Sequence, residues 1–258
     1  MQDDDIRFTI DDDRIATITL NRVHKHNALT LGMLDAIDRA LATLETEPVR
    51  ALLLRSASER FFCAGADIRE WGDIDPAAMG TRFIRAGNRV FRRIAELDVP
   101  SIAVLNGSAL GGGLELALAC DLRYAAVSAR FGFPEAAVGA IPGWLGGTRL
   151  AALAGVGRAR EMVLLGESID AARAAQWGIV NDTVPDAELD ARVAAVCAML
   201  RTRSPVSQSV AKRVLRAGAQ ADGGADVLHE LAASACKATP DAVEGVAAFR
   251  EKRAARFD

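Results

Sequence analysis

The stretch NGSALGGGLELALACD, residues 106–121, constrains the fold most, because three glycines precede a single carboxylate set among leucines and alanines. The run before them, SIAVLNG at 101–107, is typical of a buried strand, and a short helix carrying Glu115 follows. Glycine costs backbone entropy, and an unpaired carboxylate in apolar surroundings costs desolvation. Two interpretations are open. Either the glycines permit tight packing and Glu115 points to water, or they expose backbone amides to a ligand and Glu115 faces the same cavity.

Strand and helix signals alternate along the first 150 residues, which predicts repeated βαβ winding and a mainly parallel sheet. After about Ala151 the pattern is helical, with strand signal only at GIV, 178–180. The predicted strands are 6–10 and 14–20, a hairpin around an acidic turn, then 49–56, 101–107 and 121–127. The predicted helices are 30–46 with Thr30 as its cap, 76–97, and the C-terminal segments 158–166, 170–176, 186–202, 205–217, 223–236 and 240–255.

Composition narrows the class of protein. The 258 residues are 50% hydrophobic, enough to fill a sizeable core. The formal net charge of −3 disfavours a nucleic-acid or membrane-surface binder, which needs a basic excess. The four scattered cysteines indicate reduced thiols, and the acidic start MQDDDIRF lacks the features of a signal segment. We therefore expect a cytoplasmic protein that binds neither nucleic acid nor membrane.

The segment FFCAGADIRE, residues 61–70, is a second place where small residues follow an apolar strand. Small side chains at Ala64–Ala66 allow a substrate to approach main-chain amides. The alternative is an ordinary strand-to-helix turn in which Asp67 caps the helix. Both interpretations stay open from this segment alone.

A second carboxylate occurs in FGFPEAAVGAIPGWLGGTRL, residues 131–150, where Glu135 follows a proline. A lone loop glutamate is usually solvated, but Glu115 and Glu135 each follow a predicted buried strand. Parallel strands present their carboxyl ends on one edge of a sheet, so the two carboxylates are placed to face one cleft.

Other kinds of site fit poorly. The glycine spacing is not that of a dinucleotide-binding G-x-G-x-x-G motif, and no G-K-[ST] of a phosphate-binding loop occurs. The three histidines are too dispersed for a convincing metal site, and no G-x-S-x-G nucleophile motif is present. We expect no metal.

Three motifs taken together resemble the crotonase family, the enoyl-CoA hydratase/isomerase group. They are F-x-A-G-A-D at 62–67, N-G-x-A-x-G-G-G-x-E-L at 106–116 and F-G-x-P-E-x-x-x-G-x-I-P-G at 131–143. The resemblance covers essentially the whole chain. It implies an α/β spiral of repeated ββα/βαβ units at 1–200, followed by a C-terminal helical oligomerisation region at 201–258 that assembles homotrimers or homohexamers.

The resemblance also implies an acyl-CoA thioester substrate and no cofactor beyond its CoA moiety. The backbone amides of Ala66 and Gly112 would form an oxyanion hole, in which fixed donors stabilise an enolate. Glu115 would activate a water, and Glu135 would deliver a proton to Cα. Keeping both carboxylates favours an enoyl-CoA hydratase, which performs reversible syn addition of water across the 2,3 double bond. The alternative is a double-bond isomerase or another crotonase-type lyase or hydrolase.

For the CoA moiety, the resemblance implies contacts from the backbone of Ala64–Ile68, with Arg69 close by, and from two lysines, although a solvated surface charge is the alternative for each lysine. Two residues of the terminal F-R-E-K-R would reach a neighbouring subunit's ligand. The full set is Lys25, Ala64, Ala66, Asp67, Ile68, Arg69, Gly112, Phe249 and Lys252. The acyl pocket would be shaped by Trp71, Leu110, Trp144 and Leu145, with core packing as the alternative for Trp144.

One departure from the family pattern concerns this acyl pocket. Many relatives read I-P-G-x-G-G-T-Q-R, whereas this chain reads I-P-G-W-L-G-G-T-R at 141–149. The glycines are displaced by one residue, and Trp144 and Leu145 bring bulk beside the predicted pocket. We expect that bulk to shorten or redirect the acyl channel.

Overall fold

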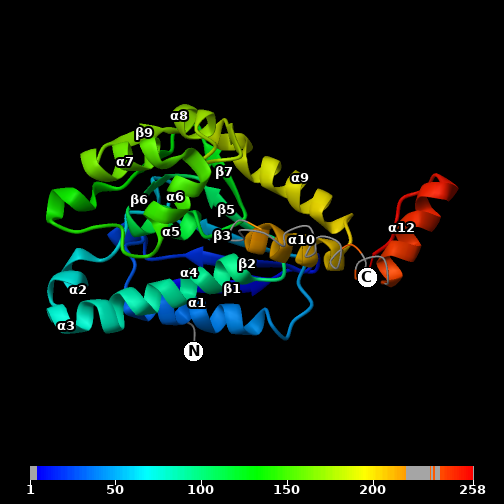
Figure 1. The fold of residues 1–258 in the computed structure, drawn as a ribbon, viewed down its shortest axis with the longest axis horizontal. Helices are drawn as coiled ribbons and strands as arrows, with labels where there is room; N and C mark the ends of the chain where they lie inside the picture. The colour runs from blue at the N-terminus through cyan, green and yellow to red at the C-terminus, as the bar shows by residue number, and fades with distance from the viewer. Residues whose placement is uncertain (1–4, 219–232, 234, 236–238, 258) are drawn as a thin grey trace.

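A six-stranded sheet with the order β1-β2-β3-β5-β7-β10 lies at the centre of the computed structural model, which describes residues 5–218, 233, 235 and 239–257 (Figure 1). The first two strands form the predicted antiparallel hairpin, and every other neighbouring pair is parallel. The bounds are β1 (Ile6–Ile10), β2 (Ile15–Leu20), β3 (Ala51–Ser56), β5 (Ser101–Leu105), β7 (Leu122–Ala126) and β10 (Asp182–Val184).

Helices cover both faces of this sheet, which explains why the central strands are apolar throughout. Ala103 and Leu105 of β5 belong to the large core that includes α1 (Leu31–Thr43) and α4 (Arg85–Glu96). Ile102 and Val104 point to the opposite face and pack with α9 (Leu189–Arg201), because successive side chains of a strand alternate between faces. Thr30 caps α1 as predicted, accepting a hydrogen bond from the Met33 amide at 3.1 Å.

A second sheet, with the order β4-β6-β8-β9, positions the candidate site. Its first three strands are parallel and the last is antiparallel to β8. Three turns therefore leave the same edge: 64–67 after β4, 111–112 after β6 and 133–135 after β8. The bounds are β4 (Phe61–Cys63), β6 (Ser108–Leu110), β8 (Arg130–Gly132) and β9 (Ser168–Asp170).

Three short helical segments, α2, α5 and η3, begin at these turns. The predicted helix 76–97 is observed as α3, a π-helical turn η2, and then α4. Glu115 lies on a short helix, as predicted. The bounds are η1 (Val23–Lys25), α2 (Ile68–Gly72), α3 (Pro76–Ala78), η2 (Met79–Ile84), α5 (Gly112–Ala117) and η3 (Pro134–Val138).

The strand predicted at 178–180 is wrong. Gly178 has φ +74°, and the Ile179 amide donates to the Ala174 carbonyl at 2.9 Å, so these residues end the preceding helix. The strand lies four residues later, as β10, and β6, β8 and β9 were not among the predicted strands. The remaining helical bounds are α6 (Gly146–Ala154), α7 (Val156–Leu165), α8 (Ala171–Gln176), η4 (Asp186–Glu188), α10 (Pro205–Gly218) and α12 (Pro240–Glu251).

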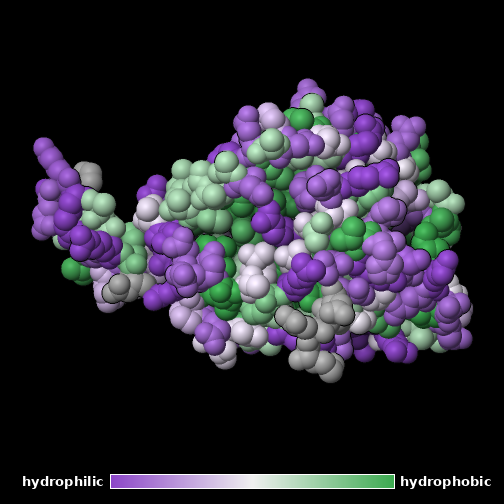
Figure 2. Space-filling model, turned by 180° about the vertical axis from the view of Figure 1, so that it is seen from behind, coloured by the Kyte–Doolittle hydropathy of each residue, from purple (hydrophilic) through white to green (hydrophobic). Residues whose placement is uncertain are grey.

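The helix α12 stands away from the rest of the chain, at the end opposite α2 and α3 (Figures 1 and 2). Of the predicted helix 223–236, only residues 233 and 235 are described, and both are helical. The predicted division at residue 200 falls at the end of α9 and stays a prediction. Among the described residues, no helix has the length and apolar character needed to cross a membrane.

Candidate active site

Glu115 lies in the first turn of α5, and its side chain is only 2% exposed. A tight turn at Gly111, which has φ +50°, leads from β6 into this helix. The Gly111 amide donates to the Gly132 carbonyl at 2.9 Å, which ties the turn to β8. The glycine run therefore serves a sharp change of direction that carries Glu115 into the interior, and the solvent-facing interpretation of Glu115 is wrong.

Two backbone amides hold the Glu115 carboxylate. Its Oε1 accepts hydrogen bonds from the Trp144 amide at 2.7 Å and from the Gly146 amide at 2.8 Å. The residue between them, Leu145, has φ +69° and ψ +9°, a left-handed conformation that directs both neighbouring amides toward one point. Such amide pairs form anion-binding concavities, so this loop favours the ionised form of Glu115.

Glu135 reaches the same place from η3, directly after Pro134 at the start of that turn. Its Oε2 is buried and has no hydrogen-bond partner. A Cβ atom at Gly111 would lie 2.8 Å from the Glu135 Oε1, so the carboxyl group packs against the glycine run. A buried, unpartnered oxygen favours the protonated form of this group.

Burial raises the pKa of both carboxyl groups to about 7 from the ordinary value of 4.5. For Glu115, desolvation is the largest cause, the two backbone hydrogen bonds act against it, and the charge of Glu135 adds to the increase. For Glu135, desolvation is again the largest cause. The pair is thus arranged to exchange protons near neutral pH.

Two further residues with backbone amides, Ala66 and Gly112, line the cavity beside these carboxyls. The Leu29 amide donates to the Gly65 carbonyl and the Asp67 amide donates to the Leu29 carbonyl, both at 2.8 Å. In this parallel pairing the Ala66 amide points the opposite way, toward the cavity that it lines. Gly112 is the first residue of α5, where an amide has no partner within the helix. A Cβ atom at Gly112 would lie 3.4 Å from the Ala66 nitrogen, so the two amides are neighbours.

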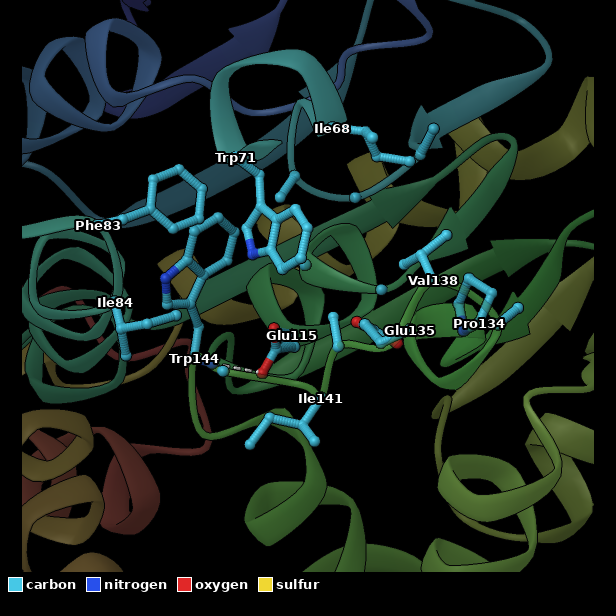
Figure 3. A pocket seen from close by; sticks show the side chains of 18 residues that line it. Ile68, Trp71, Phe83, Ile84, Glu115, Pro134, Glu135, Val138, Ile141 and Trp144 are labelled. Carbon is cyan, nitrogen blue, oxygen red and sulfur yellow. Dashed lines mark hydrogen bonds between the residues drawn. The ribbon is translucent and has the colours of Figure 1, made fainter. Parts of the chain in front are cut away.

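These groups line one apolar cavity of about 240 Å³ (Figure 3). Figure 3 shows Glu115 between two groups of side chains, with Phe83, Ile84 and Trp144 on one side and Pro134, Glu135 and Val138 on the other. The lining residues predicted from sequence are Ala64, Ala66, Ile68, Trp71, Gly112, Glu115, Glu135 and Trp144.

A second cavity of about 390 Å³ shares Ala64, Ala66 and Ile68 with the first and is more polar. Lys25 and Arg69 line it, as does Arg22. The predicted contact Asp67 also lies here, but its carboxylate accepts from the Arg69 and Glu70 amides and pairs with Arg22 at 2.6 Å. The Asp67 side chain therefore caps α2, as the alternative interpretation of this segment predicted.

Four predicted residues lie elsewhere. Leu145 does not line the cavity, and it is 37% exposed, so its predicted place in the acyl pocket is wrong. Leu110 does not line the cavity, because it ends β6 one residue before the turn that does. Phe249 belongs to α12, and its side chain lies outside the described part of the structure. Lys252 directly follows α12, far from α2 within one chain, so a role at a neighbouring subunit's ligand stays a prediction (Figure 1).

Sequence reasoning missed the wall formed by η2 and η3. Phe83 and Ile84 line the cavity from η2, and Val138 and Ile141 line it from η3 and the loop after it. The adjacent apolar pair Phe83-Ile84, between two arginines, could have indicated this wall. A regular amphipathic helix seldom directs two consecutive residues inward, so the pair suggests a local change in the helix.

A family model described as enoyl-CoA hydratase/isomerase matches residues 11–258. The chain belongs to this family. Its relatives include a protein named short-chain-enoyl-CoA hydratase from Clostridium acetobutylicum, 36% identical over 93% of this chain and 92% of that protein. A protein named crotonyl-CoA hydratase from Syntrophomonas wolfei is 36% identical over 95% of both chains. The crotonase resemblance is thereby confirmed.

Solved structures of the enoyl-CoA hydratase/isomerase family agree with the fold. An enoyl-CoA hydratase from Bacillus anthracis superposes with a TM-score of 0.93, at 33% identity and covering 98% of both chains. A second, from Geobacillus kaustophilus, has a TM-score of 0.94 at 31% identity and covers 100% of this chain and 98% of that one. The predicted α/β fold class with C-terminal helices is confirmed.

Proposed function

We propose that this member of the enoyl-CoA hydratase/isomerase family adds water reversibly across the 2,3 double bond of a 2-enoyl-CoA thioester. The observation that carries the proposal is the convergence of Glu115, Glu135 and the amides of Ala66 and Gly112 on one apolar cavity. The names of the hydratases described above support the same reaction. No cofactor is proposed beyond the CoA part of the substrate.

The thioester carbonyl oxygen would lie between the Ala66 and Gly112 amides. Attack at Cβ moves the π electrons onto this oxygen and forms an enolate. Donors already fixed in the backbone stabilise that charge without reorganising, an effect worth roughly 3–4 kcal/mol per donor in comparable sites. Gly112 is suited to this position because a side chain there would approach the Ala66 nitrogen closely.

The two carboxyls would divide the proton transfers between them. Glu115 would rest ionised, because its Oε1 accepts two backbone hydrogen bonds, and Glu135 would rest protonated, because its Oε2 is buried without a partner. Water would give its proton to Glu115 as its oxygen bonds to Cβ. The enolate would then take the proton of Glu135 at Cα, and exchange through the next water would restore both groups.

The CoA part of the substrate would occupy the second cavity, which joins the catalytic one at Ala64, Ala66 and Ile68. Lys25 and Arg69 line that cavity and would provide positive charge for phosphates. Arg22 is less available because it already pairs with Asp67.

The predicted homotrimer or homohexamer is part of the same proposal. Apolar side chains on the C-terminal helices support it, since Leu215 of α10 is 72% exposed and Val243 of α12 is 67% exposed in a single chain. Light scattering during size exclusion would distinguish a trimer or hexamer from a monomer. A cytoplasmic location stays a prediction from the sequence.

The reaction is tested by mixing the protein with crotonyl-CoA and following loss of the conjugated-thioester absorbance. Glu115→Gln and Glu135→Gln should each lower kcat by about 10²- to 10⁴-fold. The exposed Glu188, on η4 and away from the cavity, offers the matched control Glu188→Gln, which should keep full activity. Equal rates for the wild type and both active-site variants would refute the proposal. A 3-enoyl-CoA substrate, with its product identified, distinguishes isomerisation from hydration.

A further inference from the structure

The indole of Trp144 closes one end of the catalytic cavity. Its side chain is 2% exposed and its ring centroid lies 5.2 Å from that of Phe83 and 5.3 Å from that of Phe91. The Nε1 atom is buried and has no hydrogen-bond partner. A buried tryptophan usually has a hydrogen-bond partner for this nitrogen. Here packing contacts, and not a hydrogen bond, hold the ring in place.

Two glycines on different elements provide the space for this ring. A Cβ atom at Gly87 on α4 would lie 2.3 Å from Nε1, and one at Gly112 on α5 would lie 2.5 Å from Cζ3. Both distances are too short for real contacts, so alanine at either position would collide with the indole. The ring fits between α4 and α5 and forms a rigid wall.

A contact next to Trp144 extends the wall. A Cβ atom at Gly143 would lie 2.5 Å from the Ile84 Cδ1, so the loop before the indole packs against η2. Phe83 and Ile84 both line the cavity from this π-helical turn. Figure 3 shows Phe83, Ile84 and Trp144 together on one side of Glu115.

The other end of the cavity determines which way a substrate would lie. The more polar second cavity meets the catalytic one at Ala64, Ala66 and Ile68, and it is the proposed place for the CoA part. An acyl tail extending away from the Ala66 and Gly112 amides therefore points toward Trp144. The whole catalytic cavity is about 240 Å³, below the ~300–1,000 Å³ of pockets for drug-sized ligands.

We infer that Trp144 sets the chain-length limit of the acyl site and restricts the substrate to short acyl groups. This inference rests on the proposed function for the orientation of the substrate. The wall does not yield to a longer tail, because α4 and α5 hold the ring from both sides. A longer tail must either leave the cavity or displace the thioester from the two amides.

The test compares kcat/KM for crotonyl-CoA and 2-octenoyl-CoA. The wild type should favour crotonyl-CoA by at least ~10-fold, since misfitting methylenes typically cost a factor of this size. Trp144→Ala should remove or reverse that preference, and Trp144→Phe should fall between. Trp177→Ala is the matched control, because Trp177 is also buried, stacks with Arg158 and Arg173, and does not line the cavity. It should keep the wild-type ratio.

Gly87→Ala gives an independent test that leaves Trp144 in place. The added methyl would push the indole toward the cavity, so the preference for crotonyl-CoA over 2-hexenoyl-CoA should increase by several-fold. The inference is overturned if the wild type accepts both chain lengths equally. It is equally overturned if folded Trp144→Ala, verified by circular dichroism and a cooperative melt, keeps the wild-type ratio.

Calorimetry with the saturated thioesters butyryl-CoA and octanoyl-CoA separates this inference from the proposed reaction. If the protein hydrates nothing but binds butyryl-CoA at least ~10-fold more tightly, and Trp144→Ala abolishes that difference, the chain-length limit holds while the hydratase proposal fails. Equal binding of both thioesters by the wild type would overturn the limit, whatever reaction the protein performs.

Discussion

The backbone amide of Gly146 donates a hydrogen bond to the Glu115 Oε1 at 2.8 Å, and a Cβ atom at the same glycine would lie 2.2 Å from the Glu115 Cγ. The residue that holds the carboxylate therefore has no room for a side chain of its own. Gly146 therefore positions Glu115 in two ways: its amide binds the carboxylate, and its missing side chain leaves room for the Glu115 side chain.

Gly146→Ala should lower kcat about 100-fold, because a displacement of roughly 1 Å at a catalytic group has a cost of this order. Gly147→Ala is the matched control, since the nearest atom to its added Cβ would be 4.0 Å away. Steady-state kinetics with crotonyl-CoA measures both. Similar activity in the two variants would show that the position of Glu115 does not depend on Gly146.

The pH dependence of kcat/KM should be bell-shaped with its maximum near neutrality. Hydration requires one ionised and one protonated carboxyl, and the pKa of each group is raised to about 7 by burial. The two apparent values belong to the coupled pair and should fall on either side of the maximum. Rates measured in a series of buffers at constant ionic strength would test this, and a flat profile from about pH 5 to about pH 9 would contradict it.

Stability should also depend on these carboxyls. Their pKa values are about 7 in the folded state against an ordinary value of 4.5. Between these values the folded protein binds more protons than the unfolded chain. The protonated carboxyls therefore contribute to the free energy of unfolding below about pH 4.5, and this contribution is lost as the pH rises through about 7. Urea unfolding at the two ends of this window measures the effect.

Glu115→Gln isolates this contribution, because the amide oxygen can still accept both backbone hydrogen bonds without carrying a charge. The difference in the free energy of unfolding between the variant and the wild type should depend on pH. It should favour the variant by on the order of 1–3 kcal/mol more at about pH 8 than at about pH 4.5. An effect of the same size at both pH values would argue that the charge of Glu115 is not costly in the folded state.

Leu145→Gly should be more stable than Leu145→Ala by about 1 kcal/mol, which reverses the usual order of these two residues. Leu145 has φ +69°, a conformation that glycine adopts without strain and alanine does not. Thermal melts of the two variants provide the comparison. The usual order, with alanine more stable, would mean that the loop changes conformation in one of the variants.

The sequence predicted those parts of the fold that depend on local pattern. The β1–β2 hairpin, the Thr30 cap and the buried strand β5 follow from periodicity and capping chemistry, which neighbouring elements reinforce. The short strands β9 and β10 did not follow, because three residues carry too little pattern and their pairing is decided by β8 and β7.

The candidate site divides in the same way. The prediction that Glu115 and Glu135 face one cleft agrees with the structure, since both line the cavity. The strands that they follow, β6 and β8, belong to a second sheet and were not among the predicted strands. The left-handed conformation of Leu145 could not be predicted from the sequence, because leucine does not favour it. The π-helical turn at 79–84 could not be predicted either, because π-helical turns are rare and these residues do not indicate one. Both lie at contacts that form only in the folded chain, since the amides flanking Leu145 bind Glu115 and Phe83 of the turn packs on the Trp144 ring.

Trp144 contributes its main chain to one task and its ring to another, since the amide holds Glu115 while the indole ends the cavity. A substitution that enlarges the cavity also removes the bulk that keeps this amide in place. A variant that accepts bulkier thioesters should therefore also turn over more slowly, because both properties depend on Trp144. A relative with a broader substrate range would need other contacts to hold the loop that binds Glu115.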